Sequence, residues 1–220
     1  MKNIPFVKNF SDKDVKGLKK IVIAIHGYTS CKEDAIINAL SKELKKQSIG
    51  LLAFDLPGHG VNGAPLTVEN CFGTIYAAEN YLRQYEKPIC FFGYSFGGYL
   101  TLLYLSKSSA KYSNIVLCAP AIDMYKAICN SGQVNQPNVD LCQIEEVKRN
   151  NVLSVAKSID ETIHIVYGTK DNVVDNNDIF KLDELINCRL YPVEGAGHDF
   201  QKPGELEKVI SVSQDVYGGH

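Results

Sequence analysis

The sequence predicts an α/β fold, in which helices cover both faces of a doubly wound, mostly parallel sheet. Short apolar runs recur along the 220 residues, and segments with helical periodicity separate them. The apolar runs show no polar alternation, which is what strands buried on both faces require. Strands that alternate with helices favour a parallel sheet with right-handed crossovers.

Six of these runs are predicted strands, and the segments between them are predicted helices. The strands are residues 21–25, 51–55, 89–92, 115–119, 163–167 and 189–192. Helices are expected over residues 35–46, 68–85, 98–105, 177–186 and 205–216. In the first of these helices, Ile36, Ile37 and Leu40 fall on one face, as expected for a helix packed against a sheet.

We expect one domain over residues 1–220, because a chain of this length buries about 70% of its unfolded surface. One connection is unusually long and runs from the strand ending at 119 to the strand starting at 163. Long excursions at one end of a sheet are typical of lids. The segment 123–160 is therefore a predicted lid insert, with a polar turn at 131–138 and a helix over 141–158.

Composition excludes several classes of protein. Lys+Arg 23 against Asp+Glu 25 gives a formal charge of -2 without a basic block, which argues against binding to nucleic acid or a membrane surface. No run approaches the length of a membrane span, and the first residues lack a signal-peptide pattern. Seven cysteines form no C-x-x-C pair, and Cys90 and Cys118 fall in apolar runs. These features predict a cytoplasmic protein, and none of them fixes its oligomeric state.

Residues 93–97 read G-Y-S-F-G and lie between a predicted strand and a predicted helix. This context is typical of a nucleophile elbow, a sharp turn that exposes a serine, here Ser95. Glycines on either side are expected, because side chains at those positions would collide in so tight a turn. Chance also produces this pattern, so the loops after the other strands must supply the partners of a nucleophile.

Four of these loops contain residue types suited to catalysis. They follow the carboxyl ends of the strands, and in doubly wound sheets ligands bind at that edge. H-G-Y follows the first strand, and D-L-P-G-H-G begins at Asp55 after the second. G-T-K-D-N-V-V, with Asp171, follows the fifth strand, while E-G-A-G-H, ending at His198, follows the last. Asp175 and Asp178 are rival acids, although they fall where the next helix should begin.

The five histidines are not equal candidates for the catalytic base. His198 lies in a glycine-flanked loop, whereas His164 falls within a strand pattern. We interpret Asp55 and His59 as structural residues that hold the loop at His26. His59 is the alternative base, but it precedes the serine in the chain.

Together these motifs resemble those of the α/β-hydrolase superfamily, and the resemblance covers roughly residues 21–200. It implies a compact α/β-hydrolase fold and a triad of Ser95, Asp171 and His198, in that order. It also implies that the backbone N–H groups of Tyr28 and Phe96 form the oxyanion hole. The chain departs from the usual pattern after residue 60, and it has room for about one of the two strands that relatives carry before residue 20.

The resemblance implies a serine hydrolase that cleaves small carboxylic esters through an acyl-enzyme, without a cofactor or metal. Carboxylesterases, feruloyl-type esterases and monoacylglycerol lipases are the relatives that it favours. An acyl thioesterase would use the same triad, and a non-catalytic binding protein with this fold is a further alternative. A peptidase is disfavoured because the chain lacks the extra domain of many such enzymes. A dinucleotide-binding domain is disfavoured because no G-x-G-x-x-G follows the first strand.

Overall fold

The computed structural model describes residues 5–132 and 141–219, and within them it contains a seven-stranded sheet. The strands are β1 (Phe6–Lys8), β2 (Lys20–Ile25), β3 (Ile49–Phe54), β4 (Ile89–Tyr94), β5 (Ile115–Cys118), β6 (Ile163–Gly168) and β7 (Cys188–Val193). Their order across the sheet is β1-β3-β2-β4-β5-β6-β7. Only the β1–β3 pairing is antiparallel, so the predicted doubly wound, mostly parallel sheet is confirmed.

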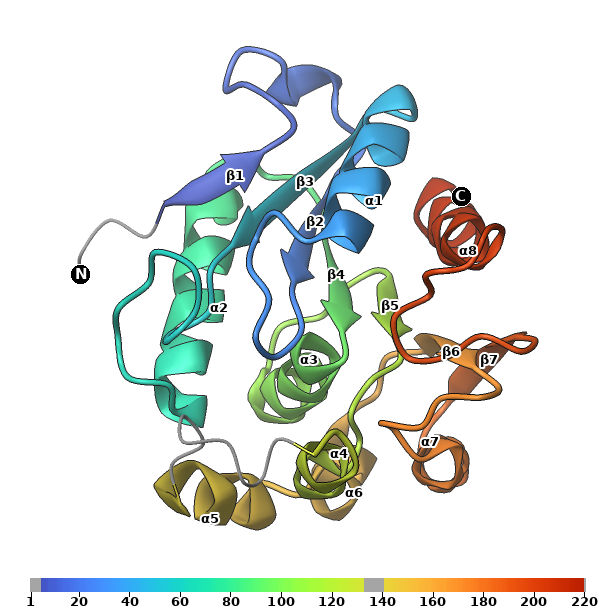
Figure 1. Cartoon of the computed structure of the whole chain (residues 1–220). Coiled ribbons are helices and arrows are strands. Elements are labelled where there is room, and N and C mark those ends of the chain that lie inside the picture. Colours follow the sequence, from blue (N-terminus) through green and yellow to red (C-terminus); the bar gives the residue numbers. More distant parts are fainter. Residues whose placement is uncertain (1–4, 133–140, 220) are drawn as a thin grey trace.

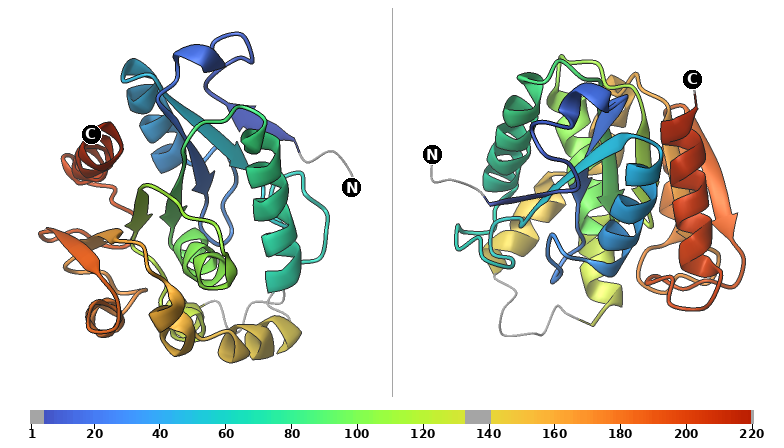
Figure 2. Two further views of the ribbon diagram at one scale, coloured as in Figure 1. Left: turned by 180° about the vertical axis from the view of Figure 1, so that it is seen from behind. Right: turned by 90° about the horizontal axis from the view of Figure 1, so that it is seen from above.

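Helices cover both faces of this sheet (Figures 1 and 2). On one face lie α1 (Ala35–Lys46) and α8 (Glu205–Gly218), which pack against each other. On the other lie α2 (Val68–Arg83), α3 (Phe96–Lys107) and α7 (Asn176–Asp183). A short 3₁₀ helix, η1 (Val15–Gly17), precedes β2. The predicted helices therefore form close to their expected ends.

The core consists of two apolar layers, one on each face of the sheet. Alternate residues of each central strand enter opposite layers. In β2, for example, Ile21 and Ile23 join the α2–α3 layer, whereas Val22 joins the α1–α8 layer. Burial on both faces is the physical reason for the unbroken apolar runs of the central strands.

Two strands differ from what their residues predicted. The strand at 189–192 was expected to be buried on both faces, and this expectation is wrong. β7 is at the edge of the sheet, and most of its residues are partly or fully exposed. At the other edge, β1 supplies the single strand for which the chain has room before residue 20. It is only three residues long and too short to show a pattern in the sequence.

The segment 123–160 contains α4 (Met124–Asn130), α5 (Leu141–Arg149), α6 (Val152–Val155) and the 3₁₀ helix η3 (Ala156–Ser158). The single helix predicted over 141–158 is therefore wrong, because it is broken after Arg149. The backbone of Asn151 is extended, and its side chain accepts the Ser154 N–H, which caps the start of the next helix. The turn predicted at 131–138 lies outside the described residues from position 133 onward.

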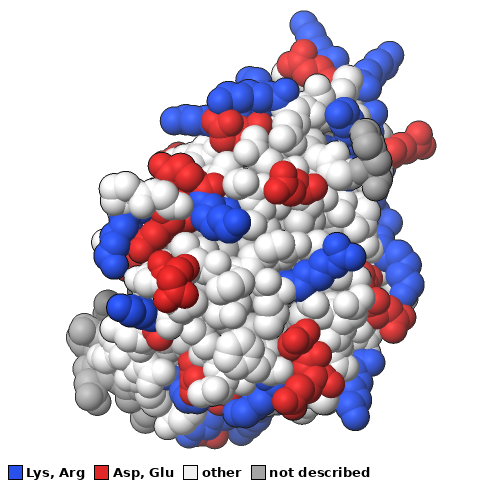
Figure 3. Space-filling model, turned by 90° about the vertical axis from the view of Figure 1, so that its right-hand side faces the viewer, with Lys and Arg blue, Asp and Glu red and all other residues white. Residues whose placement is uncertain are grey.

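The face that carries α7, β7 and α8 displays basic and acidic side chains interspersed with uncharged ones (Figure 3). Among the helices of residues 5–132 and 141–219, none is long and apolar enough to cross a bilayer.

Candidate active site

Ser95 occupies the sharp turn between β4 and α3. Its φ of 51° and ψ of -110° lie outside the regions that ordinary residues favour. Hydrogen bonds to the neighbouring strand hold this conformation. The Ser95 N–H donates to the Cys118 carbonyl at 2.9 Å, and the Ser95 carbonyl accepts the Ala121 N–H at 3.1 Å. The turn is therefore fixed by backbone contacts, as the predicted elbow requires.

The glycines beside Ser95 are required by close approach. A Cβ on Gly97 would lie 2.1 Å from the Ile25 carbonyl oxygen, and a Cβ on Gly93 would lie 2.7 Å from the Gly97 carbonyl oxygen. Both contacts are with backbone, which has no room to move in a packed sheet. The collision expected from the sequence is thus present on both sides of the serine.

The structure brings Ser95, His198 and Asp171 together, although they are far apart in the sequence. His198 Nε2 lies 2.9 Å from Ser95 Oγ, and His198 Nδ1 lies 2.8 Å from Asp171 Oδ2. Asp171 is 1% exposed, while His198 is 12% exposed and Ser95 9% exposed. A carboxylate facing Nδ1 places the proton there and leaves Nε2 as an acceptor for the serine hydroxyl.

The loop after β6 holds the Asp171 carboxylate in this orientation. Asp171 Oδ1 accepts the backbone N–H groups of Val173 at 2.8 Å and Val174 at 2.9 Å. Its other oxygen remains directed at His198. The rival acids do not reach the imidazole: Asp175 caps α7 and pairs with Lys126, and Asp178 pairs with Lys126 and Lys181.

Tyr94 supports His198 from the strand side and was not singled out by the sequence motifs. Its ring is stacked on the His198 imidazole, with centroids 5.6 Å apart and an angle of 29° between the planes. Its hydroxyl donates to Asp199 Oδ1 at 3.1 Å. Because Tyr94 directly precedes Ser95, the same sharp turn positions the serine and supports the His198 imidazole. The one signal for this role in the sequence was the position of Tyr94 directly before the serine of the predicted elbow.

The expected oxyanion donors are the backbone N–H groups of Tyr28 and Phe96. Tyr28 lies in the loop after β2, and Phe96 is the first residue of α3. Neither N–H donates to another described residue. Such N–H groups are expected at Phe96, because the first turn of a helix has no internal acceptors. Their rings are in edge-to-face contact, with centroids 5.8 Å apart.

His26 and His59 support this loop from behind as neutral acceptors. His59 Nε2 accepts the Thr29 N–H at 3.1 Å, and His26 Nε2 accepts the Leu56 N–H at 3.0 Å. The Nδ1–H groups therefore donate to carbonyls, His59 to Pro57 at 2.9 Å and His26 to Gly27 at 2.7 Å. Burial lowers the pKa of both imidazoles, that of His26 to about 4. His59 is hydrogen-bonded to the loop after β2, which contains Tyr28. This contact agrees with the structural role expected for His59.

Asp55 holds the other side of the same loop. Its carboxylate accepts the Lys32 N–H at 2.9 Å, the Lys32 ammonium at 2.7 Å and the Val61 N–H at 3.0 Å. Although desolvation opposes it, these donors lower the pKa of Asp55. Through these hydrogen bonds and the ion pair, the D-L-P-G-H-G segment connects two loops. This arrangement is what the sequence interpretation of Asp55 predicted.

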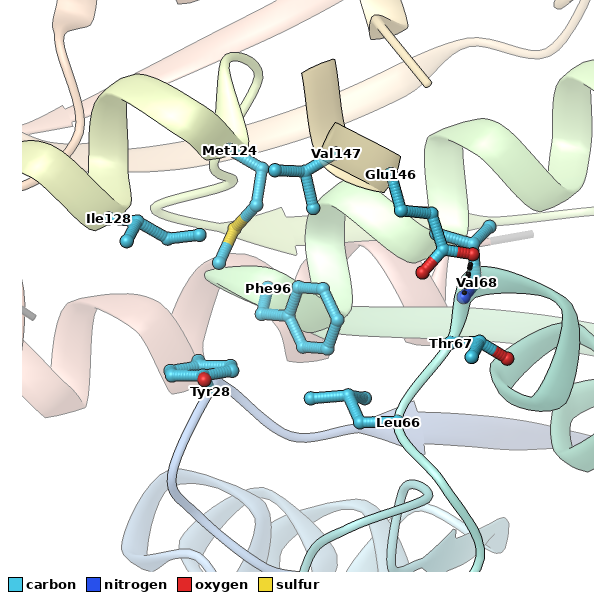
Figure 4. A pocket seen from close by; sticks show the side chains of 9 residues that line it. All are labelled: Tyr28, Leu66, Thr67, Val68, Phe96, Met124, Ile128, Glu146 and Val147. Atoms are coloured by element: carbon cyan, nitrogen blue, oxygen red, sulfur yellow. Dashed lines mark hydrogen bonds between the residues drawn. The ribbon is translucent and has the colours of Figure 1, made fainter. Parts of the chain in front are cut away.

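A pocket lies against the oxyanion loop and under the helices of segment 123–160 (Figure 4). Its walls come from segments that are distant in the sequence. The lining residues are Tyr28, Leu66, Thr67, Val68, Phe96, Met124, Ile128, Glu146 and Val147. Tyr28, Phe96, Met124 and Ile128 give the pocket apolar walls, whereas Tyr125 lines a neighbouring cavity. Residues 66–68 and 146–147 carried no motif that pointed to this site.

The sequence matches the family model Hydrolase_4, described as serine aminopeptidase, S33, over residues 16–139. This match covers more than half of the chain. The protein belongs to this family of α/β hydrolases. The predicted superfamily and its hydrolase class are thereby confirmed. The matched region contains the oxyanion loop and the elbow, whereas Asp171 and His198 lie beyond it.

Solved structures of low sequence identity share this fold over nearly their whole length. Est1E from Butyrivibrio proteoclasticus with bound ferulic acid is 19% identical, with a TM-score of 0.79 over 97% of this chain and 95% of that one. Mouse alpha/beta hydrolase domain-containing protein 10 is 17% identical, with a TM-score of 0.79 over 96% and 92%. The monoacylglycerol lipase of Paleococcus ferrophilus is 18% identical, with a TM-score of 0.76 over 99% and 100%. No curated protein sequence matches this chain significantly.

Within the described part of the chain, no group of three or more His, Cys, Asp or Glu side chains is arranged to hold a metal ion.

Proposed function

We propose that this protein is a serine hydrolase that cleaves carboxylic esters through a Ser95–His198–Asp171 triad. The observation that carries the proposal is the continuous chain of contacts from Asp171 Oδ2 through both imidazole nitrogens to Ser95 Oγ, at 2.8 and 2.9 Å. A nucleophile, its base and the group that orients the base lie within hydrogen-bond reach. These are the features by which an activated serine is recognised.

The first chemical step follows from this geometry. His198 Nε2 accepts the Ser95 hydroxyl proton while Oγ attacks the ester carbonyl carbon. The carbonyl oxygen becomes an oxyanion, which the N–H groups of Tyr28 and Phe96 stabilise by about 3 kcal/mol each. Asp171 accepts the Nδ1–H and stabilises the imidazolium. The tetrahedral intermediate then collapses, the bond to the alcohol oxygen breaks, and His198 gives its proton to that oxygen.

The second step returns the enzyme to its starting state. Water attacks the acyl-enzyme carbonyl, and His198 Nε2 accepts a proton from the water. The bond to Ser95 Oγ then breaks and Oγ regains its proton from the imidazolium. The products are a carboxylic acid and the free enzyme, so no oxidant or cofactor is consumed.

In this proposal, residues 1–220 form one domain and the segment 123–160 serves as a lid that closes the substrate pocket. Met124 and Ile128 of α4 face the side chains of Tyr28 and Phe96, so the apolar wall above the oxyanion donors comes from the lid (Figure 4). Apolar walls favour the hydrocarbon or aryl part of an ester. Structures of an esterase with bound ferulic acid and of a monoacylglycerol lipase share the fold, which supports this class.

An acyl thioesterase is the second candidate, because the same triad attacks a thioester carbonyl. Hydrolysis of a peptide bond, which the family description names, would require recognition of a substrate amine beside the scissile bond. Of the described residues lining the pocket, Glu146 alone carries a formal charge, and most of the others are apolar. These apolar walls support an ester with a hydrocarbon acyl group.

The test is the Ser95→Ala variant with a panel of p-nitrophenyl esters of increasing acyl length, hydroxycinnamate esters and acyl-CoA. We expect wild-type hydrolysis of at least one ester series, and loss of about 10⁴-fold or more in kcat for the variant. A fluorophosphonate probe should label wild-type protein at Ser95 and leave the variant unlabelled.

Thermal unfolding of Ser95→Ala is the control, since removing one hydroxyl should leave the fold intact. Wild-type rates in a folded Ser95→Ala protein would contradict the proposal. A steep preference for acyl-CoA over matched oxygen esters would favour the thioesterase instead.

A further inference from the structure

Glu146 stands out in the pocket because every other described lining residue is uncharged. It lies on α5, across the pocket from Tyr28, and its side chain is directed toward the start of α2 (Figure 4). A carboxylate beside apolar walls is costly unless hydrogen-bond donors or a positive charge compensate it. Its partners therefore reveal what the pocket accommodates.

Half of this carboxylate is satisfied by the protein. Glu146 Oε1 accepts the Val68 N–H, the first N–H of α2, at 2.8 Å. The positive end of the helix dipole offsets part of the negative charge at this position. Within the described residues, however, no lysine, arginine or histidine nitrogen lies within 4.0 Å of either oxygen.

The second oxygen, Oε2, is turned toward the side of the pocket where Phe96 and Met124 lie (Figure 4). Within the described residues it receives no protein donor. The negative charge of Glu146 also affects neighbouring groups. After burial itself, it is the next cause that raises the pKa of Tyr99 and of the Cys71 thiol. A donor arriving with the substrate would complete the hydrogen bonding of this carboxylate.

The position of the pocket shows which part of an ester would occupy it. The leaving alcohol must lie near His198 Nε2, which protonates it. No pocket residue comes from the loops of Asp171 or His198, and two of them, Tyr28 and Phe96, carry the oxyanion donors. The pocket is therefore on the acyl side of the carbonyl.

We propose that Glu146 determines acyl specificity, and that the pocket takes acyl groups whose far end carries a hydrogen-bond donor, such as a hydroxyl group. This inference rests on the proposed esterase function. The apolar walls hold the hydrocarbon part, and Glu146 Oε2 accepts the terminal donor. A site that hydrogen-bonds a substrate hydroxyl disfavours the analogue without it, because the bound analogue would cover Oε2 without giving it a partner.

The test compares methyl ω-hydroxyalkanoates of increasing chain length with methyl alkanoates of the same number of heavy atoms. Release of acid is followed by titration at constant pH. At the chain length that spans the pocket, we expect kcat/KM to be about tenfold or more higher for the hydroxyl-terminated ester, as for a hydrogen bond to a charged group. Methyl ω-aminoalkanoates form a third series, which separates a neutral donor from an ammonium.

Glu146→Gln is the decisive variant, because it keeps one role of the side chain and changes the other. The amide oxygen can still accept the Val68 N–H, whereas an NH₂ group replaces the second acceptor. If Glu146 only caps α2, this variant should behave as wild type. If it recognises the substrate, the preference for the ammonium-terminated ester, whose end group only donates, should fall to about onefold, and that for the hydroxyl, which can also accept from the NH₂ group, should fall less. Turnover of methyl-terminated esters should persist. Glu145→Gln is the matched control: Glu145 is exposed on the same helix and pairs with Lys148.

Binding to Ser95→Ala protein, measured by calorimetry, keeps the inference separate from catalysis. Tighter binding of the hydroxyl- and ammonium-terminated esters than of the methyl-terminated one, reduced by adding Glu146→Gln and most for the ammonium, would support it even if turnover were absent. Equal binding and equal kcat/KM for the donor-bearing and methyl-terminated series at every length would overturn it. Ser95-dependent turnover without such a preference would leave the proposed function standing.

Discussion

The rim of the sheet, where Ser95, Asp171 and His198 lie, and the helices of segment 123–160 are held in place by different kinds of contact. At the rim, backbone groups fix Ser95 and Asp171, and Gly93 and Gly97 permit the close approach of neighbouring chain. In segment 123–160, side chains make the connections to the rest of the molecule.

Three side chains of that segment make four polar contacts with the rest of the molecule. Lys126 pairs with Asp175 and Asp178 of α7, and Asn130 donates to the Val173 carbonyl at 3.0 Å. Glu146 joins α5 to the start of α2. A backbone-held rim tolerates few substitutions, whereas side-chain attachments can change without altering the fold. The proposed triad and the proposed specificity residue, Glu146, thus lie in regions of unequal tolerance.

The largest contrast should come from the same substitution made in each region. Asp171→Asn at the rim removes the carboxylate that orients His198, and we expect kcat to fall about 10⁴-fold. Asp175→Asn keeps the α7 cap, because its Oδ1 can still accept the Asn177 N–H, now 2.9 Å away. It weakens only the ion pair with Lys126, so kcat should change less than about tenfold.

Steady-state kinetics of both variants on the best ester of the panel provides the measurement. A similar loss of kcat in the two variants would mean that the rim acid is not distinguished from the acid that attaches α4.

A second contrast compares glycines. Gly97→Ala places a Cβ 2.1 Å from the Ile25 carbonyl, and we expect it to lower the free energy of unfolding by about 3 kcal/mol or more and to abolish turnover. Gly73→Ala is the control, since nothing outside its own helix lies within 4 Å of the added Cβ. It should raise stability by about 0.5 to 1 kcal/mol. Denaturant unfolding of both variants tests this, and equal stabilities would contradict the tight packing of the elbow.

The smallest effect concerns acid sensitivity of the oxyanion loop. His26 has an ordinary pKa of 6.5, which burial lowers to about 4. Between these values the unfolded chain binds more protons than the folded one, so stability falls as the pH decreases through this window. His26 alone should contribute a loss of about 3 kcal/mol on going from pH 7 to pH 4.

His26→Asn removes this titration, so its free energy of unfolding should depend less on pH between 7 and 4. Denaturant unfolding at several pH values compares the two slopes, and NMR titration of the wild-type imidazole measures its pKa directly. Identical slopes together with an ordinary pKa would refute the effect.

Local patterns predicted much of this molecule because they record local sterics. The apolar runs of β2 to β6 identified strands, since both faces of those strands are buried. The glycines around Ser95 identified the elbow, since no larger residue fits. The same reasoning failed for β7, because an edge strand can be apolar without being covered. It also failed across 141–158, where the Asn151 cap interrupts a continuous helical pattern.

Stretches of adjacent residues were enough to predict the sheet, the elbow and the candidates Ser95, Asp171 and His198, because each motif lies within one short segment. The packing of distant segments was needed to bring His198 to Ser95, to stack Tyr94 on the imidazole and to place Glu146 at the pocket. These contacts join segments separated by many residues, and their geometry depends on how helices pack on the sheet. A carboxylate in a helical segment resembles any solvated charge until packing places it beside the oxyanion donors.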